Sequence, residues 1–184
     1  MKAKVYVAVS LDGFIARKDG ALDWLDKANA RVPDGEDCGF AEFMHSVDAL
    51  IMGRKNFEQV LSFGQWGYGE TPVIVLSSRP QSDRPNSRDT VTWSDEKPRA
   101  LLERLSSEGV EHVYIDGGTT IQSFIADNLI DEITLTVIPV LLGEGISLFG
   151  KLGKDVNLRH ERTQTYDFGF VQIIYKVRNE LSPG

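Results

Sequence analysis

Short apolar runs recur along the chain and predict the strands of a β-sheet. The segments Ala49–Met52 and Val73–Leu76 are apolar throughout, which is typical of strands buried on both faces. The segment Glu132–Ile138 instead alternates polar and apolar residues, as a strand with one covered face does. The same criteria predict further strands at Val5–Val9, Thr90–Trp93, His112–Ile115, Leu158–Tyr166 and Phe170–Val177. The last two are joined through Asp167-Phe168-Gly169, a turn that predicts an antiparallel hairpin.

Between these strands, apolar residues recur at the three- and four-residue spacing of a helix face. Helices are expected over Phe40–Val47, around Asn56–Leu61, from Pro98 to a stop at Gly109, and after a cap at Thr119 or Thr120. Strands that alternate with helices and end in a hairpin describe an α/β domain with a mixed, mostly parallel sheet of about eight strands. A length of 184 residues fits a single domain spanning 1–184.

Composition and charge remove several classes of function. Hydrophobic residues make up 41% and charged residues 26% of the chain, and no apolar run approaches the roughly 20 residues that cross a bilayer. The N-terminus resembles a first strand rather than a signal peptide, so a cytoplasmic location without membrane attachment is expected. A net charge of -7 argues against nucleic acid as a partner. Cys38 is the one cysteine and the three histidines lie far apart, so neither a disulfide nor a metal site is expected.

Three segments place anion-binding chemistry at the predicted carboxyl ends of strands. In the first, Gly53 turns the chain from a strand into a helix, whose free N–H groups are joined by Arg54 and Lys55. In the second, a buried strand is followed by Ser77-Ser78-Arg79, which could hold a phosphate monoester. In the third, Asp116-Gly117-Gly118 lets the backbone approach a ligand before another helix begins. Taken singly, each segment is also explained by an ordinary turn or a capped helix.

One further pattern resembles a nucleotide-binding motif. Residues 145–151 follow the order G-x-x-x-x-G-K, but Leu152 stands where a P-loop requires serine or threonine. No helical pattern follows, so a nucleoside triphosphatase is not expected.

Taken together, the motifs resemble the dihydrofolate reductase superfamily, in the branch related to the C-terminal reductase domain of the riboflavin-biosynthesis deaminase/reductase. The resemblance is carried, in order, by the opening strand and loop Val7–Ala16, by Met52-Gly53-Arg54-Lys55, by Leu76-Ser77-Ser78, by Asp116-Gly117-Gly118, by Leu129–Leu135 and by Pro139–Gly145. It implies a three-layer domain, NADPH as the cofactor and a homodimer. An apolar run from Leu135 to Leu142 offers a possible subunit interface, although a buried strand explains it equally well.

The resemblance also implies roles for individual residues around the cofactor. Ala8 and Ile15 would approach the nicotinamide, and Gly53, Arg54, Lys55 and Asn56 would face the phosphates. The adenosine 2′-phosphate would meet Leu76, Ser77, Ser78 and Arg79, and the pyrophosphate would meet Asp116, Gly117, Gly118, Thr119, Thr120 and Ile121. The cofactor supplies the hydride, and the protein supplies orientation and a dry slot.

The substrate side departs from the family pattern. The riboflavin reductases carry a "D-x-P-x-L-T-x-R" stretch for a phosphosugar, and here the chain runs Phe57–Leu61 instead. Among the acids near the first helices, Asp37 is our candidate catalytic, substrate-facing group, with a helix N-cap as the alternative. Trp24 and Phe40 are candidate substrate-binding residues, although Trp24 could equally belong to the core.

The sequence therefore favours an NADPH-dependent reductase acting on a small heterocycle, either a pteridine or a 5-amino-6-(5-phosphoribosylamino)uracil-like compound. Two alternatives stay open, a non-catalytic NADP(H)-binding module and an interaction protein that kept only the fold.

Overall fold

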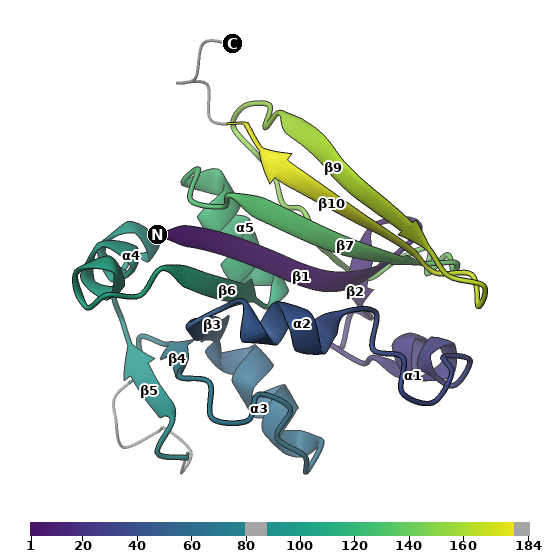
Figure 1. Cartoon of the computed structure of the whole chain (residues 1–184), viewed down its shortest axis with the longest axis horizontal. Helices are drawn as coiled ribbons and strands as arrows, with labels where there is room; N and C mark the ends of the chain where they lie inside the picture. Colours follow the sequence, from purple (N-terminus) through teal and green to yellow (C-terminus); the bar gives the residue numbers. More distant parts are fainter. Residues whose placement is uncertain (80–87, 179–184) are drawn as a thin grey trace.

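The computed structural model describes residues 1–79 and 88–178 and is built around one eight-stranded sheet (Figure 1). Its strand order is β5-β4-β3-β6-β1-β7-β10-β9. The strands from β5 to β7 run parallel, whereas β10 is antiparallel to both β7 and β9. Their bounds are β1 Lys2–Ser10, β3 Ala49–Gly53, β4 Val73–Leu76, β5 Val91–Ser94, β6 His112–Asp116, β7 Glu132–Ile138, β9 Leu158–Thr165 and β10 Val171–Val177. The predicted mixed sheet with its C-terminal antiparallel pair is confirmed.

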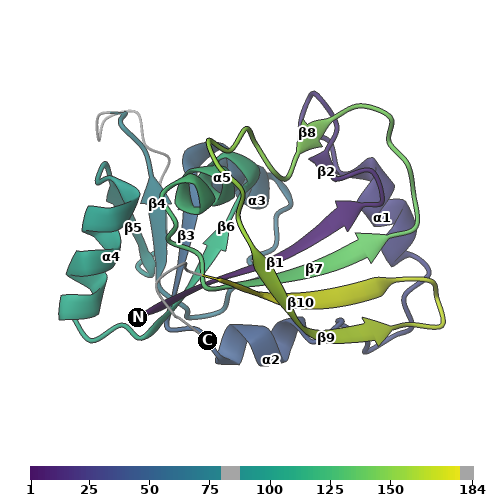
Figure 2. The ribbon, with the colours of Figure 1, turned by 90° about the horizontal axis from the view of Figure 1, so that it is seen from above.

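Helices cover both faces of the sheet, which gives the three layers expected. Helix α2 (Phe40–His45) and helix α5 (Gly118–Ala126) lie on opposite faces (Figure 2). Phe57 of α3 (Arg54–Ser62) joins the apolar cluster on the α2 face, whereas Leu101 of α4 (Pro98–Ser107) joins the cluster on the α5 face. Because β3 lies between the two clusters, its apolar residues are buried on both sides.

Three short elements were not predicted. Helix α1 (Asp23–Asn29) packs through Trp24 and Ala28 against Ile138 and Phe170 in a third, smaller cluster. Strand β2 (Phe14–Ala16) pairs with β8 (Ile146–Ser147) in a separate two-stranded sheet (Figure 2).

The prediction that Thr119 or Thr120 caps the helix after β6 is wrong. Helix α5 begins at Gly118, one or two residues before either threonine, and it has no side-chain cap. The preceding Gly117 has φ 89°, so the turn is made by glycine backbone rather than by a hydroxyl.

Within the residues that the structure describes, no helix is long and apolar enough to cross a membrane.

Candidate active site

The three segments singled out in the sequence meet at the carboxyl edge of the parallel strands. In the sheet register, Gly53 of β3 is opposite Leu76 of β4, and Met52 is opposite Asp116 of β6. The amide of Ser77 continues this alignment by donating to the Ser94 carbonyl of β5 at 2.9 Å. Ligands of open α/β sheets bind outside this edge, where the helices that follow the strands present free N–H groups.

Glycines let the backbone segments of this edge pack closely. A Cβ on Gly53 would stand 2.9 Å from the Thr120 hydroxyl, and one on Gly118 would stand 2.5 Å from Cδ1 of Ile15. At Gly117, a Cβ would lie 3.2 Å from Cβ of Asn56. Larger residues would therefore fill the cradle that the starts of α3 and α5 form, which we call the glycine cradle (Gly53, Gly117 and Gly118). The cradle fits a group that approaches backbone N–H donors, as a pyrophosphate does.

Asp116 organises the cradle from within. Its carboxylate accepts hydrogen bonds from the amide of Gly117 at 2.8 Å, from Nδ2 of Asn56 at 2.8 Å and from the Tyr68 hydroxyl at 3.4 Å. Burial raises the pKa of Asp116 above its usual range, and these donors oppose that shift. Asn56, expected to face phosphate, thus holds Asp116 in this structure, and Tyr68 is a contributor that the sequence did not reveal.

The predicted basic residues differ in their surroundings. Arg54 donates through Nη1 to both carboxylate oxygens of Glu58 at 2.6 Å, one helical turn further along α3. Its side chain is only 20% exposed, so a phosphate would have to compete with Glu58 for the guanidinium. Lys55 is exposed to solvent, as are Ser78 and Arg79 beyond β4. Of the other predicted cofactor residues, Thr119 is exposed and Ile121 is buried in the core.

On the α2 face of the sheet lies a cavity of about 670 Å³. We call it the sheet-face cavity, and it lies between the sheet and the segment 29–40. The described residues that line it are Tyr6, Ala8, Leu25, Asn29, Val32, Pro33, Asp34, Gly35, Glu36, Asp37, Cys38, Phe40, Tyr114, Thr136, Ile138 and Phe170. Ala8, Asp37 and Phe40, named from the sequence, therefore come together here. Trp24 does not line it; it is 3% exposed and packs with Ile138 and Phe170, two residues of the cavity wall.

The register of β1 and β6 connects the cavity with the cradle. Lys4 is opposite Tyr114, so two residues further along Tyr6 is level with Asp116, where β6 ends. Ala8 consequently lies just beyond that end, level with the glycines of the cradle. A ligand extended across the sheet edge could place one end in the cradle and the other in the cavity.

A buried amide holds the floor and wall of the cavity together. Gln172, only 4% exposed, donates through Nε2 to the Tyr6 hydroxyl at 3.0 Å, the Cys38 carbonyl at 2.9 Å and the Thr136 hydroxyl at 3.1 Å. The Tyr6 hydroxyl itself donates to the Cys38 carbonyl at 2.6 Å. The segment 29–40 is thereby tied to β1, β7 and β10. A glutamine at an inward position of an apolar strand was the one signal of this network in the sequence, and it was missed.

Asp37 lines the cavity and accepts hydrogen bonds from amides at the start of α2. Its Oδ2 accepts from the amide of Ala41 and its Oδ1 from the amide of Gly39, both at 2.8 Å. These hydrogen bonds stabilise the ionised form and hold the pKa of Asp37 below its usual range. Asp37 thus stabilises the start of α2 through the Ala41 amide, although the N-cap position itself is Gly39, and Asp37 is among the residues that line the cavity.

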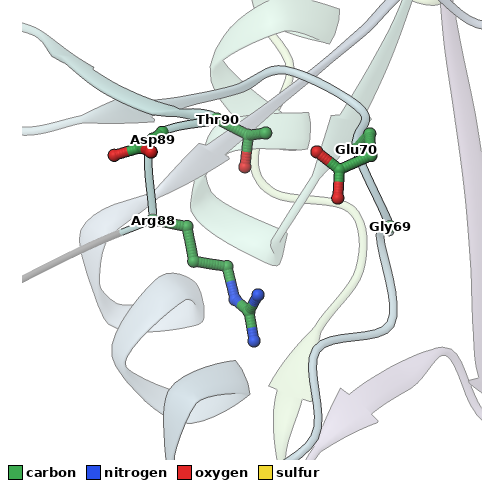
Figure 3. Close-up of a pocket in the computed structure, with 5 residues that line it drawn as sticks. All are labelled: Gly69, Glu70, Arg88, Asp89 and Thr90. Carbon is green, nitrogen blue, oxygen red and sulfur yellow. The ribbon is translucent and has the colours of Figure 1, made fainter.

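A second, smaller cavity of about 330 Å³ lies at the other end of the strands (Figure 3). It is lined by Gly69, Glu70, Arg88, Asp89 and Thr90, next to the amino ends of β4 and β5. The Arg88 guanidinium lies 5.5 Å from the centre of the Trp66 ring. Because parallel strands direct ligands to their carboxyl ends, this cavity is not part of the candidate active site.

Comparison with known families decides the relationship. The family model of the RibD C-terminal domain matches residues 3–172. The chain belongs to the RibD C-terminal domain family. The reductase branch of the dihydrofolate reductase superfamily that the motifs resemble is thus confirmed.

Relatives within this family cover nearly the whole chain. The uncharacterised protein YwjB of Bacillus subtilis strain 168 is 37% identical over 168 residues, covering 90% of this chain and 92% of YwjB. Its counterpart YyaP, also uncharacterised and from the same organism, is 30% identical over 181 residues, covering 92% and 91%.

Solved structures confirm the RibD C-terminal fold. A protein provisionally assigned to riboflavin biosynthesis in Shewanella sp. PV-4 superimposes with a TM-score of 0.90 at 37% identity, covering 97% of this chain and all of that one (100%). The deaminase/5-amino-6-(5-phosphoribosylamino)uracil reductase of Thermotoga maritima has a TM-score of 0.68 at 14% identity, covering 96% of this chain and 56% of that one. The latter likeness shows the fold alone.

Proposed function

We propose that this member of the RibD C-terminal domain family is an NADPH-dependent reductase that transfers hydride to a small heterocyclic substrate. The observation that carries the proposal is the strand register, which sets Ala8, a residue of the cavity wall, level with the glycines that follow β6. A nucleotide pyrophosphate at the cradle would leave the nicotinamide end of the same cofactor at the cavity floor. The family and the reductases among its structural neighbours support an oxidoreductase of this type.

Residues of this chain would bind and orient the cofactor in three places. Backbone N–H groups at the starts of α3 and α5 would meet the pyrophosphate, with Thr119 and Thr120 at its side. Ser77, Ser78 and Arg79 would meet the 2′-phosphate, and Ala8 with Ile15 would border the nicotinamide. When bound, the cofactor supplies the hydride.

The sheet-face cavity would hold the substrate ring, either a pteridine or a pyrimidine such as 5-amino-6-(5-phosphoribosylamino)uracil. Phe40 offers an aromatic surface for the ring. Asp37, ionised by its two backbone donors, would accept a hydrogen bond from a ring N–H and so orient the substrate. In this state it is a hydrogen-bond acceptor rather than a proton donor, which revises the role expected from the sequence. Trp24 supports the wall of the cavity from the core.

The cofactor half of the proposal is tested by nucleotide selectivity. Replacing Ser77 and Arg79 together by alanine should weaken NADPH binding about tenfold or more and leave NADH binding nearly unchanged, because charged hydrogen bonds to the 2′-phosphate are lost. The measurement is the dissociation constant of each cofactor by tryptophan fluorescence. Ser107→Ala with Arg99→Ala in α4, far from β4 in the chain, is the matched control and should change neither constant. Equal losses for both cofactors would refute the assignment of the 2′-phosphate, and no binding of NADPH at millimolar concentration would refute the function.

A non-catalytic NADP(H)-binding module is the second candidate, favoured by one observation. The pKa of Asp37 is held below its usual range, so this carboxylate does not offer a proton to a substrate at neutral pH. Tight NADPH binding without oxidation of NADPH, followed at 340 nm against a panel of pteridines and pyrimidines, would favour this alternative.

We further propose that residues 1–184 form one domain that works in the cytoplasm as a homodimer. Leu135 of β7 and Ile173 of β10 are only partly buried, and Leu141 is 68% exposed, so apolar surface is available near the predicted interface. Light scattering should give the mass of two chains, and the mass of one chain would refute the dimer.

A further inference from the structure

The charged residues that line the sheet-face cavity are all acidic. Three carboxylates, Asp34, Glu36 and Asp37, line it along a single loop. None of the described residues that line the cavity is a lysine, an arginine or a histidine. The charge of the wall is therefore negative wherever the carboxylates are ionised.

Two of these carboxylates are fixed in place. Asp37 is held by the amides of Gly39 and Ala41, and Oε1 of Glu36 accepts from the amide of Cys38 at 2.6 Å. Their charge acts on the groups around them. Burial is the main reason that the pKa of the Cys38 thiol is raised, and the charges of Glu36 and Asp37 raise it further.

The basic residues near this loop are not among the residues that line the cavity, although the charge of Arg162 acts on Tyr166, which interacts with Cys38. Lys27 pairs with Asp23 at 3.2 Å, and Lys4 donates to Ser46. Arg31 is exposed and is not among the residues that line the cavity. In the segment Phe57–Leu61, which stands where the riboflavin reductases carry an arginine-containing stretch, Phe57 is fully buried in the core. This segment has no basic residue and so supplies no cation to the cavity.

We propose that the sheet-face cavity excludes phosphorylated substrates and accepts an uncharged or cationic, amino-substituted nitrogen heterocycle. The inference rests on the proposed function and narrows its substrate class. A phosphate monoester carries a charge of about −1.5 to −2 at neutral pH. Asp34, Glu36 and Asp37 are exposed to solvent, and the described lining residues include no cation, so a phosphate placed against these carboxylates is repelled. An amino-bearing ring edge instead donates hydrogen bonds to the same carboxylates.

The test uses two pairs of probes whose members differ by one anionic group. The first pair is 5-amino-6-ribosylaminouracil and its 5′-phosphate, and the second is pterin and 6-carboxypterin. Binding is measured by calorimetry with the cofactor site saturated with NADP⁺, which cannot donate hydride. We expect the member without the added anion to bind at least about tenfold more tightly in each pair, and the gap to narrow as ionic strength rises.

A variant identifies the source of the selectivity. Asp34→Asn with Glu36→Gln removes two of the carboxylates and should reduce the gap several-fold. Glu103→Gln with Asp155→Asn removes two exposed carboxylates outside the cavity and should leave the gap unchanged. Because both double variants change the net charge equally, a general electrostatic effect would appear in both.

The outcomes separate this inference from the function on which it rests. If NADP⁺ binds and the phosphorylated or carboxylated member binds as tightly as its partner, the charge selectivity is wrong while the cofactor proposal stands. If NADP⁺ binds and no member of either pair binds, the substrate class proposed here is also wrong. If NADP⁺ itself does not bind, the proposed function fails.

Discussion

Gly145 belongs to a sequence pattern that resembles a phosphate-binding loop, but the structure gives this glycine a packing role. It begins the G-x-x-x-x-G-K pattern, yet in the structure it directly precedes β8, which pairs antiparallel with β2. A Cβ at this position would collide with the carbonyl oxygen of Ala16 and approach the Phe14 side chain. The glycine is therefore explained by close backbone packing rather than by phosphate binding.

Gly145→Ala should accordingly destabilise the protein by about 1–3 kcal/mol, because the obstructing atom belongs to backbone that cannot rotate away. Urea denaturation measures the change. Gly153→Ala is the control, since a Cβ there meets nothing within 4 Å, and it should leave stability nearly unchanged. Equal effects of the two substitutions would contradict the packing argument.

Gln172 is the residue on which the floor of the cavity depends. Gln172→Ala removes the donor to the Thr136 and Tyr6 hydroxyls and leaves the Cys38 carbonyl with the Tyr6 hydroxyl alone, with an expected loss of about 1–3 kcal/mol. Gln164→Ala, at the paired position on β9, removes an exposed amide and should cost little. The free energies of unfolding of both variants test this, and a similar cost for both would show that the network contributes nothing particular.

At the scale of elements, the segment 29–40 acts as a wall because its end is capped. Asp37→Ala should destabilise the protein by about 1 kcal/mol through the loss of the α2 cap, whereas Asp37→Asn should retain most of that stability. Asp34→Ala, three residues earlier, is the control, because its side chain makes no hydrogen bond to the described parts of the chain. Thermal unfolding of the three variants gives the comparison. A loss in Asp34→Ala as large as that in Asp37→Ala would show that charge in the loop, and not the cap, matters.

Some helices and strands could be predicted from the sequence with their exact bounds, and others could not be predicted at all. Strands β4 and β7 begin and end where the pattern predicted, because burial on both faces, or on alternate residues, leaves a clear signal. Helix α1 has seven residues, three of them charged, and β2 pairs with a strand about 130 positions away, so neither has a local pattern that distinguishes it from a loop.

One part of the candidate site could likewise be predicted from the sequence, and the other part could not. Glycine turns at strand ends are local and predicted the cradle. The sheet-face cavity is lined by residues of β1, β6 and β7, by Phe170 just before β10 and by residues between 25 and 40, and these become neighbours only through the strand order. Phe40 and Asp37 were identified because they begin a helix, whereas the partnership of Tyr68 with Asp116 joins two segments that the sequence gives no reason to pair.

At the scale of the whole molecule, charge distribution governs the response to acid. Several carboxylates have pKa values held below their usual range: Asp12, Asp23, Asp48, Glu96 and Glu161. For Asp23, hydrogen bonds from Arg17 and then Lys27 lower the pKa to about 2. The pKa of Asp116 is shifted in the opposite direction, because burial raises it.

The sign of the resulting pH dependence follows from proton binding. A carboxyl group whose pKa is lower in the folded state than its unfolded value of about 4 stabilises the fold above pH 4. That stability is lost as the pH falls through the folded value, since the unfolded chain then binds more protons. With Asp37, six carboxylates have lowered pKa values and outnumber Asp116, so the melting temperature should fall as the pH is lowered from 4 to 2.

Arg17→Gln isolates one contribution to this fall. The variant removes the guanidinium that lies 2.7 Å from Asp23, so the pKa of Asp23 should return toward its usual value. The variant should be less stable than the parent at pH 6, and the difference should shrink as the pH falls toward 2, where Asp23 is about half protonated in the parent and mostly protonated in the variant. Lys154→Gln removes one positive charge from an exposed residue and should parallel the parent at every pH. Calorimetry measures the melting temperature of each protein between pH 6 and pH 2. If the melting temperatures of Arg17→Gln and the parent change in parallel with pH, the ion pair does not contribute to the stability that is lost in acid.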